Sequence, residues 1–155
     1  MFKIRLVNKQ DVSDLKQVLD TIELFPSDML DDMMADYLDN PNSEEIWFTA
    51  IDNEVPISIG YCAPEKLTEG TYNLYAIGVR SDIQASGVGT KMMSFIEQYL
   101  KDRQTRVLIV ETSGSDDHKL TRNFYEKLNY AKEAVIRDFW SEGEDKIIYW
   151  KKLNA

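Results

Sequence analysis

Cysteine and histidine are almost absent from this chain of 155 residues, which holds one of each, Cys62 and His118. A single cysteine excludes an internal disulfide framework, and one cysteine with one histidine cannot make a His/Cys zinc centre. We therefore expect no metal. We interpret Cys62 as a small apolar strand residue, and we assign no role to His118.

Long apolar runs are also missing, since no hydrophobic stretch approaches the roughly 18 residues that a membrane-spanning helix requires. Residues 1–7 alternate apolar and charged side chains, which is not the pattern of an export signal. No polar or Gly/Ser-rich linker divides the chain, and its length suits one ordinary core. We expect a single domain over residues 1–155 that is cytoplasmic and has no membrane partner.

Basic residues are scarce in one segment. Residues 11–45 contain eleven acidic residues and a single base, Lys16, whereas acids and bases nearly balance in the rest of this chain of net charge −9. Such a field repels nucleic acids and acidic membranes and attracts cationic ligands, although solvated helix faces explain most of these side chains equally well. We expect no nucleic-acid partner.

Hydrophobic periodicity predicts the element order βααβββαβαββ. The expected strands cover residues 2–7, 46–51, 55–63, 73–79, 106–111, 131–140 and 146–153. Of the expected helices, one runs from a cap at Asp11 or Ser13 to Pro26, a second from a cap at Ser27 to about Asn40, and others cover about 88–102 and 117–128. The apolar run 106–111 is typical of a strand covered on both faces, with Glu111 at its end. The fold class is α+β with a mixed, mainly antiparallel sheet.

A glycine turn joins the strand at 73–79 to the helix that follows it. Gly87 and Gly89 stand where this helix begins, although glycine costs about 1 kcal/mol relative to alanine within a helix. Glycines let a bulky group approach the backbone, and the free N–H groups of a first helical turn favour anions. The turn therefore predicts a phosphate or pyrophosphate site.

Two common phosphate motifs do not fit this turn. A Walker loop needs four residues between its glycines and then Gly-Lys-Ser/Thr, but one residue separates Gly87 from Gly89, and Thr90 precedes Lys91. The dinucleotide fingerprint requires a third glycine at position 92, which is Met92, and no βαβ unit follows.

The pattern that does fit is Gln/Arg-x-x-Gly-x-Gly/Ala after an apolar strand ending in valine. It is carried by Val79, Gln84, Gly87 and Gly89. In these residues the chain resembles the GNAT superfamily of acetyl-CoA-dependent N-acetyltransferases, whose fold has helices on both faces of its sheet.

A second block, residues 122–130, resembles the later N-x-Y-x-K-x-G-F segment of that superfamily. Asn129 replaces its glycine, and asparagine also tolerates the left-handed conformation that such a helix end requires. The two blocks occur in the right order, about 35 residues apart, and the resemblance extends over roughly residues 2–153 as a matching order of elements.

The resemblance implies acetyl-CoA as co-substrate. The backbone of Ile77 to Val79 would pair with the pantetheine arm, with the Val79 N–H facing the thioester oxygen, and Asn123 would also bind pantetheine. The pyrophosphate would be held by the turn, that is by Gln84, Ala85, Ser86, Gly87, Val88, Gly89 and Thr90.

The sequence indicates the catalytic residues less directly than it indicates the cofactor site. The resemblance places Tyr125 as the acid that protonates the departing thiolate, because a phenol with a pKa near 10 can share a proton with a thiol near 8.5; packing on the sheet is the alternative. In many relatives a glutamate at the position of Tyr75 acts as the general base. Tyr75 is not such a base, and we expect it to contact the substrate instead. Glu111, as a lone carboxylate beside apolar neighbours, is the replacement candidate for base or substrate anchor, with a hydrogen bond to the next loop as the alternative.

Asp138, beside Phe139 and Trp140, is a further candidate for contacting a cationic acceptor, unless it is simply an exposed strand residue.

The leading hypothesis is direct acetyl transfer to a primary amine of a small, cationic molecule or a peptide. A non-catalytic acyl-CoA sensor is the main alternative, because Tyr75 replaces the glutamate. The acidity of the chain disfavours an RNA-directed acetyltransferase. The oligomeric state stays open, with a homodimer among the alternatives.

Overall fold

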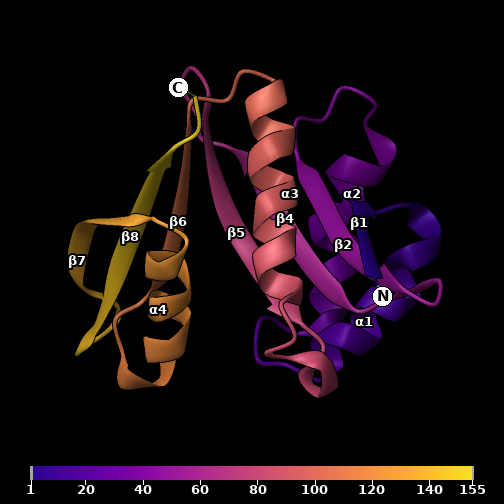
Figure 1. Ribbon diagram of the computed structural model, residues 1–155, viewed down its shortest axis with the longest axis horizontal. Helices are drawn as coiled ribbons and strands as arrows, with labels where there is room; N and C mark the ends of the chain where they lie inside the picture. Colours follow the sequence, from indigo (N-terminus) through magenta and orange to yellow (C-terminus); the bar gives the residue numbers. More distant parts are fainter. Residues whose placement is uncertain (1, 155) are drawn as a thin grey trace.

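The computed structural model describes residues 2–154, which form one mixed sheet between two layers of helices (Figure 1). The strands are β1 (Phe2–Leu6), β2 (Ile46–Asp52), β3 (Val55–Pro56), β4 (Ser58–Pro64), β5 (Thr71–Val79), β6 (Val107–Ser113), β7 (Ala131–Ser141) and β8 (Glu144–Lys152). The α-helices are α1 (Val12–Asp20), α2 (Leu30–Asp39), α3 (Val88–Asp102) and α4 (Lys119–Lys127). The strand order is β1-β2-β4-β5-β6-β8-β7, with β3 beside β2, and of these pairs β5–β6 alone is parallel.

Each face of the sheet has its own hydrophobic core. Beneath α3, Met92 and Ile96 pack with residues of the sheet such as Phe48. On the opposite face Leu15 of α1 and Leu30 of α2 pack around Trp47. Because every helix buries one stripe against the sheet, helices cover both faces, and the expected α+β fold class is confirmed.

The sheet opens between its two parallel strands. Pairing runs from Thr71↔Val107 to Leu74↔Val110 and then stops, although both strands continue. Beyond that point β5 pairs with β4 alone and β6 with β8 alone. Tyr75 lies in a bulge of β5, because Leu74 pairs with Cys62 whereas Ala76 pairs with Tyr61. The edge of β5 that faces β6 is therefore left without a strand partner over residues 76–79, among the residues described.

Strand β6 differs from its prediction in two respects. It does not end at Glu111 but continues to Ser113. It is also not covered on both faces, since Leu108, Val110 and Thr112 are buried while Ile109 and Glu111 are partly exposed. The reason is that α1 and α2 pack on β2, β3 and β4 rather than on β6. One face of β6 is thus open beside the gap in the sheet.

Smaller differences concern element ends. The predicted strand at 55–63 is divided into β3 and β4, and α1 ends at Asp20, well before Pro26. The second helical segment starts at Ser27 as a 3-10 turn without a side-chain cap, so the predicted cap there is wrong. None of the helices between residues 2 and 154 combines the length and the apolar character needed to cross a bilayer.

Candidate active site

The glycine turn ends at an uncapped helix. Gly87, at φ +89°, is the residue before α3, and no side chain caps the helix there. The bond from Lys91 N–H to the Gly87 carbonyl is the first of the helix, which leaves the amides of residues 88–90 available to a ligand. Within the turn, Gln84 Nε2–H donates to the Val79 carbonyl at 3.1 Å, and the Ser86 hydroxyl donates to the Ile83 carbonyl. These bonds fix the backbone of the turn just before the first amides of α3.

The two glycines of the turn have different surroundings. A Cβ on Gly87 would meet nothing within 4 Å, so open space lies in front of it. A Cβ on Gly89 would lie 3.4 Å from the Phe124 ring, an ordinary contact. Phe124 belongs to α4, so the structure brings the two sequence blocks together although they are far apart in the chain.

Tyr125 is nearly enclosed on the inner side of α4. It is 3% exposed, and its ring lies against those of Phe124, Tyr130 and Tyr149. Burial raises the pKa of Tyr125 well above its usual value, so the expected near match with a thiol does not hold in the unliganded protein. Its hydroxyl makes no hydrogen bond to any described residue. Asn123, on the same helix, is exposed.

Tyr75 projects from the bulge of β5 toward the face that carries α1 and α2. Its ring stacks on Tyr61 at a centroid distance of 5.6 Å, and Tyr61 in turn stacks on Trp47 at 4.2 Å. The Tyr75 hydroxyl donates to Glu65 Oε1 at 3.2 Å. Burial raises the pKa of Tyr75, and the Glu65 carboxylate adds to the rise. Tyr75 is therefore itself bonded to a carboxylate.

Glu111 is not the lone carboxylate that we expected. Lys146 Nζ lies 3.0 Å from its Oε1, and Asn73 Nδ2–H donates to its Oε2 at 3.2 Å. The same Asn73 amide donates to Glu65 Oε1 at 2.8 Å. One buried asparagine thus joins two carboxylates, Glu65 just after β4 and Glu111 within β6, the two strands that flank β5.

Asp138 has a structural task in the β7–β8 hairpin. Residues 137–140 lie between the pairs Ile136↔Lys146 and Ser141↔Glu144, which makes a wide bulge. There Asp138, at φ +55°, accepts the Gly143 N–H at 2.9 Å. The bulge directs Phe139 over Lys146, whose Nζ lies 4.0 Å from the ring centroid. Phe139 is therefore in contact with the Lys146–Glu111 pair.

Comparison with protein families decides the identity of this arrangement. A model described as the acetyltransferase (GNAT) family matches residues 12–130, a range that includes the glycine turn and α4. The chain belongs to the acetyltransferase (GNAT) family. The resemblance stated from the two sequence blocks is confirmed, and so is the N-acetyltransferase class, at the level of the family.

Solved structures of GNAT proteins share the whole fold. A putative acetyltransferase of the GNAT family from Desulfovibrio desulfuricans is 27% identical, with a TM-score of 0.89 over 99% of this chain and 98% of that chain. The ribosomal-protein-S18-alanine N-acetyltransferase from Escherichia coli is 18% identical, with a TM-score of 0.81 over 100% of this chain and 96% of that one. An aminoglycoside 6'-N-acetyltransferase complexed with coenzyme A is 17% identical, with a TM-score of 0.77 over 97% of both chains.

A curated relative covers less. An uncharacterized N-acetyltransferase from Methanocaldococcus jannaschii is 24% identical over 84 residues, which are 54% of this chain. The chain thus spans about half of that relative, since the match covers 53% of its length.

In this GNAT protein, sequence reasoning missed Asn73, Lys146 and Glu65. Asn73 is 1% exposed in the middle of β5, and a polar residue within an apolar strand was the one available signal. Nothing local marked Lys146 or Glu65, because each meets its partner only when the strands are assembled.

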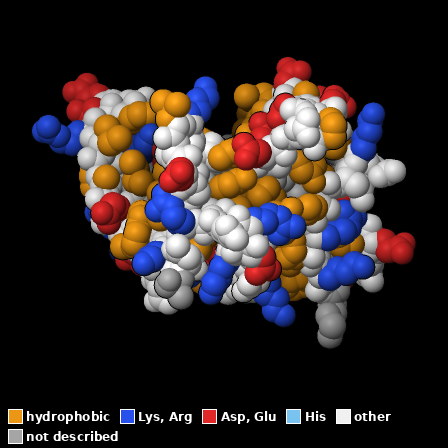
Figure 2. Space-filling view, turned by 90° about the horizontal axis from the view of Figure 1, so that it is seen from above, with side chains coloured by type: hydrophobic (Ala, Val, Ile, Leu, Met, Phe, Trp, Pro, Cys, Tyr) orange, Lys and Arg blue, Asp and Glu red, His pale blue; other side chains and the backbone are white. Residues whose placement is uncertain are grey.

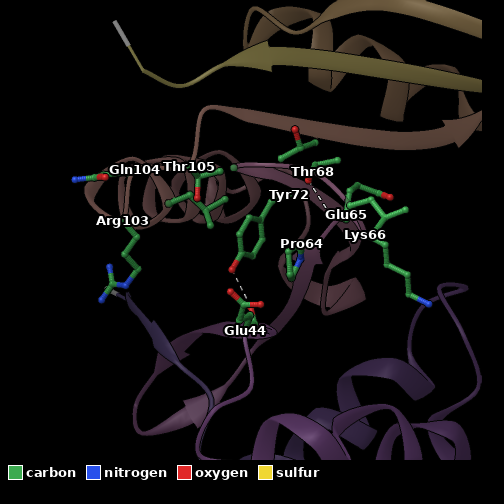
Figure 3. A pocket seen from close by; sticks show the side chains of 13 residues that line it. Glu44, Pro64, Glu65, Lys66, Thr68, Tyr72, Arg103, Gln104 and Thr105 are labelled. Carbon is green, nitrogen blue, oxygen red and sulfur yellow. Dashed lines mark hydrogen bonds between the residues drawn. The ribbon is translucent and has the colours of Figure 1, made fainter.

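Two hollows flank the segment 64–66. The larger, about 730 Å³, lies between the start of β5 and the C-terminal end of α3, where Tyr72 donates to the Glu44 carbonyl (Figure 3). It is at the opposite end of α3 from the glycine turn. The smaller, about 440 Å³, is lined by Tyr75 and Tyr61. Seen from above, a notch separates the lobe of β7 and β8 from the lobe of α1 and α2 (Figure 2).

The buried tyrosines predict a loss of stability at alkaline pH. Burial raises the pKa of Tyr125 and, together with Glu97, that of Tyr130, so both phenols stay neutral in the folded protein at pH values where unfolded tyrosines ionise. The stabilisation is complete below about pH 10 and is lost as pH rises further. We expect the melting temperature to fall from pH 9 to pH 11 by roughly 5 °C or more.

Differential scanning calorimetry tests this expectation. Tyr125→Phe should reduce the size of the alkaline fall, whereas Tyr99→Phe, which changes a partly exposed ring on α3, should leave it unchanged. Equal falls in the wild type and in Tyr125→Phe would contradict the role given to burial.

Proposed function

We propose that this protein transfers the acetyl group of acetyl-CoA directly to a primary amine of a small, cationic molecule or a peptide. The observation that carries the proposal is the uncapped start of α3, with open space at Gly87, directly after the unpaired edge of β5. Family membership and the relative complexed with coenzyme A support it.

The residues present fit coenzyme A. The free amides of residues 88–90 and the positive end of the α3 dipole suit a diphosphate. The open edge of β5, including Ile77 and Val79, offers backbone groups to a pantetheine amide, much as an added strand would. Asn123 is exposed and free to join them from α4.

When bound, acetyl-CoA would supply an activated acyl group and a leaving thiolate. The Val79 N–H would donate to the oxygen on which negative charge develops as the C–N bond forms. Tyr125 would donate its proton toward the sulfur as the C–S bond breaks. The proton lost by the attacking amine would pass to a carboxylate that is bonded to Asn73.

Two carboxylates bond to Asn73, and their surroundings differ. Glu111 forms an ion pair with Lys146. Glu65 has no cationic partner among residues 2–154 and accepts hydrogen bonds from Asn73 and Tyr75. We retain Glu111 as a base or substrate anchor and add Glu65 as a second acceptor-side group. We retain Asp138, in the β7–β8 hairpin, only as a contact for a cationic acceptor.

Replacing Glu111 separates its structural and chemical roles. Glu111→Gln leaves the Lys146 side chain, which is 11% exposed, without its counter-charge, so we expect a loss of about 2 kcal/mol of stability. Glu111→Gln combined with Lys146→Met should recover the melting temperature. If Glu111 takes part in transfer, the double variant stays slow; recovery of both stability and turnover would show that the residue is structural.

The proposed function is tested by calorimetry with acetyl-CoA and by a thiol-release assay across a panel of amines. Binding followed by amine-dependent thiol release is the expected result, and it should be stronger for cationic amines than for neutral ones. No association with acetyl-CoA would end the proposal. Tight binding with no release across the panel would instead favour the acyl-CoA sensor, which the replacement of the family glutamate by Tyr75 makes a genuine second candidate.

A further inference from the structure

The smaller hollow has an unusual lining. It lies between α2 and the end of β4, and the ionisable residues around it are mainly acidic, with Asp36, Glu45 and Glu65 among them against the single base Lys66. Its aromatic wall is the stacked pair Tyr61 and Tyr75. Tyr75 also stands at the bulge where the sheet opens, so the hollow leads away from the proposed point of acetyl transfer.

Two buried polar atoms beside this hollow lack partners. Glu45 Oε1 and Trp47 Nε1 are both inaccessible to solvent, and neither has a hydrogen bond among the residues described. Burial raises the pKa of Glu45 and the charge of Asp36 adds to the rise, while Trp47 and Tyr61 oppose it as nearby donors. These donors face the carboxylate, but Oε1 and Nε1 do not reach hydrogen-bonding geometry. Such unpaired buried groups are costly unless something else satisfies them.

Asn73 also has a buried polar atom without a hydrogen-bond partner. Its Nδ2 holds Glu65 and Glu111, while its Oδ1 is buried and unpaired. Acceptor oxygens without donors, next to aromatic faces, are the groups that an organic ammonium ion satisfies. A ligand without a donor would leave these oxygens unpaired, and an anionic ligand would be repelled.

We propose that this hollow binds a second positive charge on the acceptor, with Glu45 as its partner, so that the protein prefers short diamines to monoamines. One amino group would lie near Tyr75 and Glu65 for acetylation, and the other would lie between Glu45 and the Tyr61 ring. This inference rests on the proposed function and specifies its substrate class.

Three amines of similar length test the proposal. 1,4-Diaminobutane, pentylamine and 5-aminopentanoate differ at the far end by a positive, a neutral and a negative group. We expect kcat/KM for the diamine to exceed that for pentylamine by about tenfold or more, with 5-aminopentanoate slowest. In Glu45→Gln the advantage of the diamine should fall to about twofold, while the rate on pentylamine stays nearly unchanged.

Asp39→Asn is the matched control. It removes one negative charge from the same acidic segment, at an exposed position on α2 that does not line the hollow. It should keep the full preference. A loss as large as in Glu45→Gln would show that the general field, rather than a contact with Glu45, selects the diamine, and would overturn the proposal.

Binding provides a readout that does not need turnover. Calorimetric titration of 1,4-diaminobutane into the protein loaded with coenzyme A should give a signal that Glu45→Gln weakens by about tenfold and that pentylamine does not reproduce. If the protein binds coenzyme A but acetylates none of the amines, this titration still decides the inference, and the proposed function fails separately. Equal binding of the diamine to Glu45→Gln and wild type would overturn the inference.

Discussion

Coenzyme A is expected to bind about tenfold or more weakly to Gly87→Ala, because a side chain there fills the space in front of the free amides of α3 and weakens their bonds to the diphosphate. The φ of +89° adds backbone strain of about 1 kcal/mol for any residue with a Cβ. Isothermal calorimetry with coenzyme A, together with a melting curve, measures both effects.

The chain offers a matched control for that strain. Gly143, in the β7–β8 turn, has φ +85° and also no atom within 4 Å of an added Cβ. Gly143→Ala should therefore cost similar stability and leave the affinity unchanged. Gly89→Ala should bind coenzyme A nearly normally, because its Cβ makes an ordinary contact with Phe124. If Gly87→Ala binds coenzyme A as tightly as Gly143→Ala does, the diphosphate lies elsewhere.

Turnover is expected to fall about a hundredfold in Tyr125→Phe, within the range that loss of a general acid typically causes. The variant removes one oxygen from a packed aromatic cluster, so the fold and the affinity for acetyl-CoA should be retained. The measurement is kcat with a good amine acceptor from pH 6 to pH 10.

The pH profile adds a second readout. Since burial raises the pKa of Tyr125, the phenol stays protonated across this range, and the wild type should show no alkaline loss of activity attributable to it. A variant whose turnover matches the wild type at every pH would refute the acid role and leave Tyr125 as a packing residue.

These experiments address a site created by one irregularity in the sheet. The bulge at Tyr75 coincides with the point where β5 and β6 stop pairing, so the same few residues direct Tyr75 to the acceptor face and release the edge of β5. The Asn73 amide then ties the carboxylates on either side of that opening together. Substitutions at Asn73 should accordingly disturb both sides at once.

The sequence by itself determined the order of the elements, the α+β class and the position of the glycine turn. These are local properties, since apolar periodicity and glycine at a helix start depend on residues close together in the chain. Asn129, predicted to accept the left-handed conformation, has φ +70°. The family followed from two short blocks for the same reason.

Only the tertiary structure decided the environment of each functional side chain. Glu111 looked isolated in the sequence, yet Lys146 reaches it from β8 and Asn73 from β5. Tyr125 was expected to have an ordinary phenol pKa, but three rings from α4, β8 and the loop between α4 and β7 enclose it. Charge pairing and burial depend on groups that are distant in the chain and adjacent in space, so no local pattern could have specified them.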